Sequence, residues 1–332
     1  MSTNWTSVIR GCIVGGALGD AHGYQAEHNT PAPIISDDTQ LTLFTLEALT
    51  ELLDWTNQGV ATDTSALLWI SCLRWLRTQG ELIPDGAPAP PRTWLETSPP
   101  MQRRHPGRAT LTGLSSGIQG TARHPQNLTA RGPGSLMRSA PFGLIPGIDT
   151  GTIVTFALDG AALTHGHPAA LAASAAFPVI IHQLALGTAL PDAIDAGAQV
   201  ADNLEATDLA SSLRTVASLK HDGDASAQPP LTDRFGPGKL ADDILVLALA
   251  CVAREHSGDP ENADDASERF VNAVVHGTQV AEDKDTTAAV IGNLSGALYG
   301  ERALPEAWLQ ETEDLDVVER AVDEFTRQSV DA

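Results

Sequence analysis

Ser36-Asp37-Asp38-Thr39-Gln40 is followed directly by Leu41-Thr42-Leu43-Phe44-Thr45-Leu46-Glu47-Ala48-Leu49. Apolar residues recur at helical spacing in the second segment, which predicts that the acidic pair lies at the N-terminal end of an amphipathic helix. The first four side chains all offer hard oxygen atoms, and such atoms in a small space suit Mg²⁺, Mn²⁺ or Ca²⁺ and not zinc. Asp37 and Gln40 are also consistent with an ordinary capping box. The cluster is therefore a metal site only if the chain supplies more oxygen ligands elsewhere.

A second acidic segment, Glu282-Asp283-Lys284-Asp285-Thr286-Thr287, lies near the other end of the chain. It again precedes an apolar segment rich in small residues, so it also predicts the start of a helix. A turn of the form Asp-x-Asp-Thr can direct both carboxylates and the threonine oxygen at one point. Two acidic helix starts in one chain favour a shared metal cluster.

Composition limits the class of protein. The chain has 332 residues, 42% of them hydrophobic, and a formal charge of −22. Length alone suggests about two domains, but ligands near residues 36 and 285 must meet, so we expect one domain over residues 1–332. The charge argues against nucleic-acid backbone or an anionic membrane as a partner. The three cysteines have no paired spacing and lie in apolar segments, which is typical of buried thiols in a reducing compartment such as the cytoplasm.

The hydrophobic pattern predicts an all-α fold: a single compact orthogonal helical domain with a metal site at helix N-termini. Strand signals are scarce, because aromatic residues are only 5% of the chain and clean alternation is absent. We see no targeting segment, and we expect the long apolar stretch Ala169–Leu186 to be a buried helix and not a membrane span. Three connections are expected at Ile83–Pro100, Asp222–Pro230 and Ser257–Asp265. The expected helices are Thr6–Leu18, Thr39–Asn57, Thr64–Thr78, Thr110–Gly120, Thr152–Thr164, Ala169–Leu186, Leu190–Asn203, Asp208–Leu219, Lys239–Glu255, Ala266–Val280, Thr286–Tyr299 and Leu315–Gln328.

Three further segments complete a recognisable order of motifs. They are GCIVGGALGDA at residues 11–21, GPGSLMRSAP at 132–141 and LTHGHP at 163–168. Together with the two acidic segments, they resemble the five motifs of the ADP-ribosylglycohydrolase family. Five motifs in the family's order are a much stronger signal than any one of them.

The resemblance implies a hydrolase that removes ADP-ribose from a modified protein or small-molecule acceptor. Such an enzyme cleaves the N- or O-glycosidic bond at the ribose anomeric carbon, with two divalent cations, Mg²⁺ or Mn²⁺. On this basis we expect Asp37 or Asp38 to be the catalytic base, and Glu27 to act in gating or proton transfer. The expected metal ligands are Ser36, Asp37, Asp38, Asp283, Asp285 and Thr286. The expected substrate-binding residues are Gly132, Gly134, Ser135, Met137, Arg138 and His165.

The residues themselves leave alternatives for several of these roles. The N–H groups of Gly134 and Ser135 can cradle a diphosphate, or the loop is simply a tight turn, with Met137 packed beneath it. Arg138 can meet a phosphate or an acidic residue of the metal shell. His165 is expected near the bound ribose, although a core histidine is the commoner case. The basic segment Arg103–Arg108 either holds a phosphate or acceptor or is a solvated surface loop.

The chain also departs from the family pattern. The connection from Glu27 to Ser36 is short, Lys284 stands where a small polar residue is usual, and Pro133 replaces a polar residue. A non-catalytic ADP-ribose or nucleotide binder, or a crystallin-like structural member of the family, is therefore an alternative. A two-metal phosphoesterase using the same oxygen ligands is a third reading.

Overall fold

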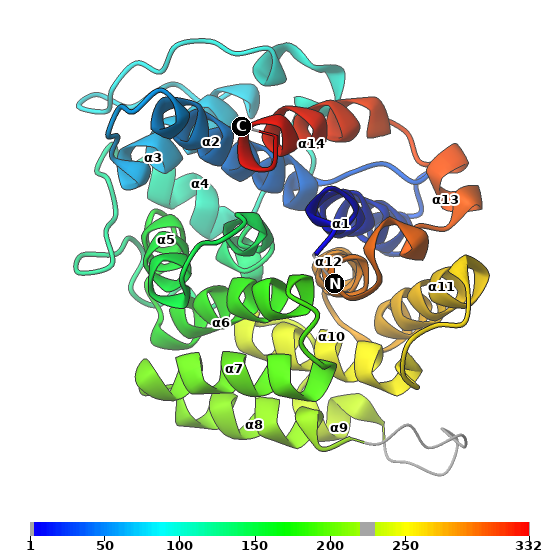
Figure 1. Cartoon of the computed structure of the whole chain (residues 1–332). Helices are drawn as coiled ribbons and strands as arrows, with labels where there is room; N and C mark the ends of the chain where they lie inside the picture. The colour runs from blue at the N-terminus through cyan, green and yellow to red at the C-terminus, as the bar shows by residue number, and fades with distance from the viewer. Residues whose placement is uncertain (1–2, 220–229, 332) are drawn as a thin grey trace.

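Helices make up the regular structure of residues 3–219 and 230–331, which are the residues that the computed structural model describes (Figure 1). Within these ranges there is no strand, only an isolated bridge between Thr121 and His124, so the prediction of an all-α fold is confirmed. Most of the predicted connection Asp222–Pro230 lies outside the described residues. The α-helices are α1 (Trp5–His28), α2 (Asp37–Asn57), α3 (Thr64–Thr78), α4 (Arg108–Leu114), α5 (Thr150–Ala162), α6 (Pro168–Ala185), α7 (Leu190–Asn203), α8 (Thr207–Ala217), α9 (Leu231–Phe235), α10 (Ala241–Glu255), α11 (Ala263–Val280), α12 (Lys284–Tyr299), α13 (Glu306–Glu311) and α14 (Leu315–Ser329). Short 3₁₀ helices are η1 (Leu95–Thr97), η2 (Pro99–Met101), η3 (Pro133–Ser135), η4 (Ala140–Leu144) and η6 (Gly300–Ala303).

Helices α1 and α12 form the centre of the fold, with the other helices arranged around them (Figure 1). Glycine recurs at every fourth position of α1, so the glycines form one stripe along the helix. A β-carbon at Gly15 would lie 2.7 Å from the carbonyl oxygen of Gly292, and one at Gly23 would lie 2.6 Å from the Cα of Asp285. The two backbones therefore touch along their length, and this contact brings the C-terminal end of α1 to the N-terminal end of α12.

The end of α1 corrects the sequence prediction. We expected a helix that ends at Leu18. Instead α1 continues to His28, and Asn29 closes it in the left-handed conformation with φ of 54°. Packing against α12 outweighs the poor intrinsic propensity of glycine.

The remaining predicted helices are present, although several of their bounds shift. Those at Thr64–Thr78 and Leu190–Asn203 have the predicted bounds. The helix expected over Thr110–Gly120 is shorter, at Arg108–Leu114, and α9 and α13 were not predicted. Both are too short to show a hydrophobic period.

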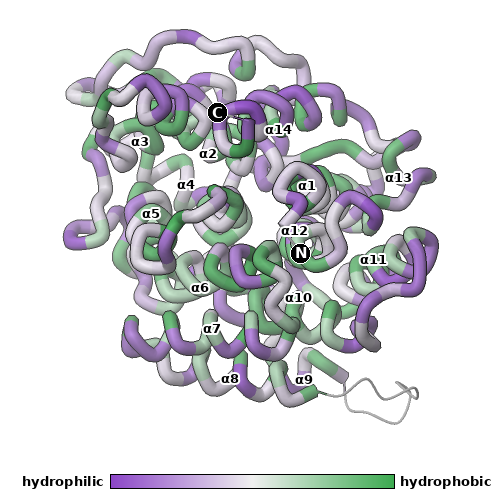
Figure 2. Tube along the Cα trace, in the orientation of Figure 1, coloured by the Kyte–Doolittle hydropathy of each residue, from purple (hydrophilic) through white to green (hydrophobic). Residues whose placement is uncertain are grey.

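Burial separates the inner helices from the outer ones. In Figure 2 apolar residues are concentrated in α6 and α10, while polar residues follow the outer sides of α11 and α14. Helix α6 is long and apolar enough to cross a membrane by length and composition, but 78% of it is buried inside the protein. It is therefore the core helix that the sequence predicts. Cys12, Cys72 and Cys251 are buried free thiols, as expected.

Candidate functional site

An acidic cavity of about 260 Å³ lies where the C-terminal end of α1 meets the N-terminal ends of α2 and α12. The two acidic segments predicted to meet therefore do so. None of the described residues that line the cavity is a lysine or arginine. Its lining residues are Glu27, His28, Asp37, Asp38, His105, Gly107, Pro133, Gly134, Met137, Asp283, Asp285 and Thr286.

The N-terminal end of α2 places Asp37 and Asp38 in the cavity wall. Ser36 is the N-cap, and its hydroxyl accepts a hydrogen bond from the backbone N–H of Asp38 at 3.1 Å. The alternative capping box is not formed, because the amide of Gln40 donates instead to the carbonyls of Pro100 and Gln102. Ser36 is fully buried and does not line the cavity, whereas both aspartates do.

The two carboxylates have different surroundings. Asp37 Oδ2 accepts a hydrogen bond from the backbone N–H of Gly107 at 3.2 Å. Asp38 is only 4% exposed, and its Oδ2 atom is buried without a hydrogen-bond partner. Because buried acceptors are almost always satisfied, this oxygen indicates a binding position for a donor or a cation.

The N-terminal end of α12 supplies the opposite wall. Asp283 is the N-cap, and the backbone N–H of Thr286 donates both to its Oδ1 at 3.2 Å and to Asp285 Oδ1 at 2.9 Å. Glu27 Oε2 in turn accepts a hydrogen bond from the backbone N–H of Lys284 at 2.9 Å. Glu27 therefore reaches the site despite the short connection that follows it, and it ties α1 to the first turn of α12. Lys284 itself does not line the cavity.

Asp20 is a residue of this site that the sequence analysis left without a role. Its Oδ2 atom accepts hydrogen bonds from the backbone N–H groups of Ser36 at 2.8 Å and Thr39 at 3.1 Å, and from the Thr39 hydroxyl. Asp20 is fully buried. It therefore fixes the start of α2 against α1 and is a positioning residue for Asp37 and Asp38.

Burial and mutual repulsion weaken the acids of this cluster. Burial, with the nearby charge of Asp285, raises the pKa of Asp20 to about 7 and the pKa of Asp283 to about 8. The same two causes raise the pKa values of Asp37 and Asp38 well above the usual range. Carboxyl groups gathered without a compensating cation hold their protons more tightly, so the cluster has a strong electrostatic preference for bound positive charge.

The loop through η3 forms the third wall, and only part of it faces the cavity. Gly134 and Met137 line the cavity, whereas Gly132 does not. The hydroxyl of Ser135 accepts a hydrogen bond from Ser174 at 2.9 Å behind the loop. A hydroxyl from α2 supports the same loop, because Thr42 donates to the carbonyl of Met137 at 3.1 Å.

Arg138 and His165 lie beneath this loop and not on the cavity surface. Arg138 is 2% exposed and donates to the Gly160 carbonyl at 2.9 Å and to the Thr164 hydroxyl at 2.8 Å, not to an acidic side chain. His165 is also 2% exposed, and burial, with the charge of Arg138, lowers its pKa to about 3. Its ring packs against Gly134, where an added β-carbon would lie 2.9 Å from Cε1. In this structure both residues support the loop.

Comparison with known proteins identifies the family of the chain. The family model described as "ADP-ribosylglycohydrolase" matches residues 1–331. The chain belongs to the ADP-ribosylglycohydrolase family. A solved structure described as an "ADP-ribosylglycohydrolase-related protein complex" is similar in fold, with a TM-score of 0.63, 22% sequence identity, and coverage of 98% of this chain and 99% of that one. A search among curated proteins gave no significant match.

Two histidines that line the cavity of this ADP-ribosylglycohydrolase family member were missed by the motif analysis. His28 and His105 line the cavity, and their ring centroids lie 4.2 Å apart, beside the ring of Tyr24. His105 has a positive φ of 50°, which is uncommon outside glycine. In the sequence, the only indication of a role for His105 was its position in the basic segment Arg103–Arg108. The two arginines before it form ion pairs, Arg103 with Glu81 and Arg104 with Asp314. The segment is therefore not only a solvated surface loop, because Arg104 is buried.

The carboxylates around the cavity are not positioned close enough together to coordinate one metal ion as a group. Within the described residues, no group of three or more histidine, cysteine, aspartate or glutamate side chains has the arrangement of a metal site. The types of donor still suit a hard cation, because every side-chain group in the two acidic segments that faces the cavity offers oxygen.

Proposed function

We propose that the acidic cavity is the active site of a hydrolase that releases ADP-ribose from a modified acceptor by cleaving the bond at the ribose anomeric carbon. The observation that carries the proposal is the convergence of carboxylates from the N-terminal ends of α2 and α12 on one cavity, in a chain of this family. The free thiols and the lack of paired cysteine spacing favour the cytoplasm as its compartment.

Two divalent cations, Mg²⁺ or Mn²⁺, suit this site. The unpartnered oxygen of Asp38 and the raised pKa values of its neighbours support a position for positive charge. ADP-ribose carries a diphosphate, and the described lining of the cavity offers no lysine or arginine to hold it. When bound, two cations would supply that positive charge and would lower the pKa of a water molecule. The residues that would hold them are Asp37, Asp38, Asp283, Asp285 and Thr286, with Ser36 as the sixth ligand that the family resemblance implies.

The chain's own residues supply the proton chemistry. Glycosidic cleavage proceeds through an oxocarbenium-like transition state, and a water molecule must lose a proton as it attacks. Asp38 suits the base, because one of its oxygens lies in the buried wall without a hydrogen-bond partner and can accept a proton. Asp37, held by the N–H of Gly107, is the second candidate. Glu27 lies at the edge of the cavity, where it can pass a proton to solvent or to the leaving group.

A non-catalytic ADP-ribose or nucleotide binder is the second candidate function. The spacing of the carboxylates favours it, because no group of three in the described residues is arranged for a metal. In that case, ADP-ribose would bind without being released from any acceptor.

An assay of ADP-ribose release tests the proposal. The protein is incubated with a panel of ADP-ribosylated arginine, serine, nucleobase and small-molecule acceptors, with Mg²⁺, Mn²⁺ or EDTA, and the products are separated by chromatography. Metal-dependent release of ADP-ribose from at least one acceptor is expected, and Asp38→Asn is expected to abolish it. The matched control is Asp323→Asn on α14, an exposed carboxylate outside the cavity. Release of AMP would instead indicate a phosphoesterase, and binding without turnover would indicate the second candidate.

A further inference from the structure

Arg104 is the buried residue of the basic segment Arg103–Arg108, and the proposed hydrolysis gives it no role. Its Nη1 atom donates to the carbonyl of Ile35 at 2.7 Å, and its Nη2 atom donates to Asp314 Oδ2 at 3.0 Å. Ile35 directly precedes Ser36, which is the N-cap of α2. One guanidinium group therefore joins the start of α2 to the residue that precedes α14.

The same segment reaches the acidic cavity three residues later. The backbone N–H of Gly107 donates to Asp37 Oδ2 at 3.2 Å. Between the two contacts, His105 lies in the left-handed conformation, and its ring packs against the rings of Tyr24 and His28 on α1. Residues 104–107 therefore contact α2 on both sides of its N-cap, at the carbonyl before it and at the carboxylate after it.

Asp314 has features that helix capping does not explain. It occupies the N-cap position of α14 in the left-handed conformation, with φ of 69°, and its side chain makes no capping hydrogen bond. N-cap residues normally have an extended backbone, and positive φ is uncommon outside glycine. Its carboxylate instead accepts the hydrogen bond from Arg104. An unfavourable backbone conformation that persists in a folded protein is a reason to look for a role.

Two contacts with the residues before α14 hold the short connection between α1 and α2. The backbone N–H of Glu313 donates to the carbonyl of Pro33 at 3.0 Å. Asp314 acts on the carbonyl of Ile35 through Arg104. Both carbonyls lie just before the N-cap of α2, so the place at which α2 begins is set partly from outside the acidic cavity.

We propose that Arg104, oriented by Asp314, is a positioning residue for Asp37. By fixing the carbonyl of Ile35, it keeps the first turn of α2 where Asp37 accepts the N–H of Gly107 through one oxygen and offers the other oxygen to a cation. Only this last step rests on the proposed function. Arg104 does not line the cavity, so it acts through these contacts alone. Arginine suits the task, because its planar fork donates in fixed directions.

Three substitutions separate the parts of this arrangement. Asp314→Gly removes the partner of Arg104, and glycine adopts the positive φ without steric cost. Asp314→Asn is the rescue variant, because asparagine tolerates the same backbone conformation and keeps an oxygen that can accept the hydrogen bond. Arg104→Lys keeps the positive charge but loses the planar fork.

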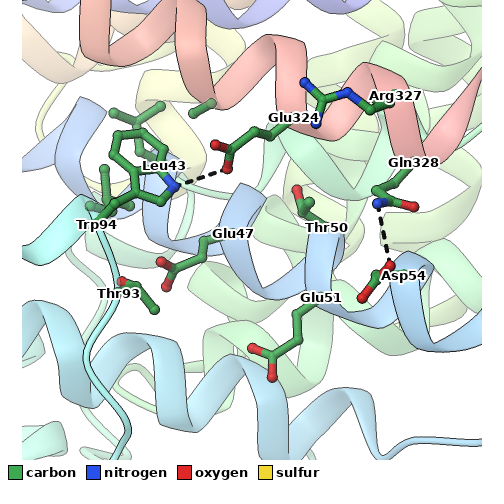
Figure 3. Close-up of a pocket in the computed structure, with 12 residues that line it drawn as sticks. Leu43, Glu47, Thr50, Glu51, Asp54, Thr93, Trp94, Glu324, Arg327 and Gln328 are labelled. Atoms are coloured by element: carbon green, nitrogen blue, oxygen red, sulfur yellow. Dashed lines mark hydrogen bonds between the residues drawn. The ribbon is translucent and has the colours of Figure 1, made fainter.

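Helix α14 is expected to keep its place in all three variants, because other contacts hold its later turns. Figure 3 shows Gln328 beside Asp54 of α2, to which it donates at 3.4 Å. The indole nitrogen of Trp94 donates to Glu324 at 2.9 Å. None of these contacts involves Arg104 or its partners.

Two neighbouring residues supply matched controls. Asp316→Asn removes an exposed carboxylate from the first turn of α14, so it reproduces the loss of charge at Asp314 without touching Arg104. Arg103→Lys makes the same chemical change as Arg104→Lys at an exposed ion pair with Glu81. Both controls are expected to behave as the wild type does in each measurement.

Hydrogen exchange followed by mass spectrometry, on the whole protein without added metal, is the first measurement. Asp314→Gly and Arg104→Lys are expected to exchange faster than the wild type at residues 34–40 and 104–108. Asp314→Asn is expected to lie closer to the wild type than to Asp314→Gly. Unchanged exchange in both test variants, or equal effects of the asparagine and glycine variants, overturns the proposal.

Titration calorimetry with Mn²⁺ and steady-state ADP-ribose release are the second measurement. Residues that orient metal ligands typically change metal affinity by about 10–100-fold, and we expect about tenfold weaker Mn²⁺ binding in Asp314→Gly and Arg104→Lys. We also expect kcat to fall by a larger factor than KM rises, because neither side chain lines the cavity. A lower melting temperature with wild-type Mn²⁺ affinity and kcat indicates a structural role only and overturns the proposal. A wild-type protein that neither binds Mn²⁺ nor releases ADP-ribose contradicts the proposed function instead, and the exchange result then decides the positioning role.

Discussion

Replacing Gly23 with alanine is expected to push the first turn of α12 away from α1. The added β-carbon would lie 2.6 Å from the Cα of Asp285, 2.6 Å from the Lys284 carbonyl oxygen and 2.9 Å from the Ala288 β-carbon. Ordinary contacts begin at 3.4 Å, so the helices must separate by roughly 1 Å to relieve the overlap. Most of these neighbours are backbone atoms, which cannot rotate out of the way.

The energetic cost follows from two opposing terms. Overpacking a close-packed interior costs typically about 1–3 kcal/mol, and we expect the upper end here because the clash is with backbone. Alanine offsets up to about 1 kcal/mol through its better helix propensity. The free energy of unfolding is therefore expected to fall by about 2 kcal/mol. In a chain of this length that lowers the melting temperature by roughly 3 °C.

The assay compares three glycine variants by thermal melting and by ADP-ribose release. Gly15→Ala clashes with the Gly292 carbonyl at 2.7 Å, far from the acidic cavity, so it should lose stability but retain more activity than Gly23→Ala. Gly151→Ala, in the exposed first turn of α5, meets only Asp149 Oδ1, at 3.1 Å, and no backbone atom, so it should lose much less stability than either of the other variants. If Gly23→Ala melts within about 1 °C of the wild type, the close contact of α1 and α12 is refuted.

Four further outcomes are expected. Mg²⁺ or Mn²⁺ should stabilise the fold by roughly 2.7 kcal/mol at a hundredfold excess over the dissociation constant; identical melts in EDTA would argue against a metal cluster. Asp38→Asn and Asp285→Asn should each abolish turnover with unchanged circular dichroism, and near wild-type activity in either would make its carboxylate dispensable. Glu27→Gln should slow turnover about 10²–10⁴-fold. ADP-ribose affinity should not change, because the glutamine side chain can still accept the hydrogen bond from the Lys284 N–H. A variant that turns over at the wild-type rate would show that Glu27 takes no part in the chemistry. Burial lowers the pKa of His22 to about 4. As pH falls, His22 therefore takes up a proton in the unfolded chain at a higher pH than in the folded protein, and stability is lost as pH falls from about 6.5 towards 4. His22→Phe should make the melting temperature less sensitive to pH over this range, and an unchanged pH profile would contradict the role given to His22.

The sequence was informative where local pattern and tertiary structure agree. The acidic segments at residues 36–39 and 282–287 precede apolar helical runs, and the structure places their carboxylates at one cavity. Helices with a clear apolar period and a capping residue, such as α3 behind Asp63, were predicted with correct bounds. In these segments the local signals are strong enough to fix the element.

The sequence was misleading where a distant contact decides the outcome. The predicted helix ended at Leu18, but Gly19 and Gly23 allow the close approach of α12, and the helix continues to His28. Had the helix been extended, Asp20 and Glu27, seven residues apart, would have been placed on the same face. The orientation of Arg138 and His165 could not be predicted, because it depends on the carbonyl of Gly160 and on the packing beneath Gly134.

The pairing of α1 with α12 also has a consequence for how the chain folds during synthesis. The two helices are separated by more than 250 residues of sequence, and an N-terminal segment emerges before the segment that covers it. Until residues 284–299 are made, the glycine-rich face of α1 has no native partner. The acidic cavity therefore cannot assemble until nearly the whole chain has been made, and closing so long a loop favours slow folding. Premature termination before α12 should yield a chain that lacks not only half of the acidic cluster but also its central helix pair.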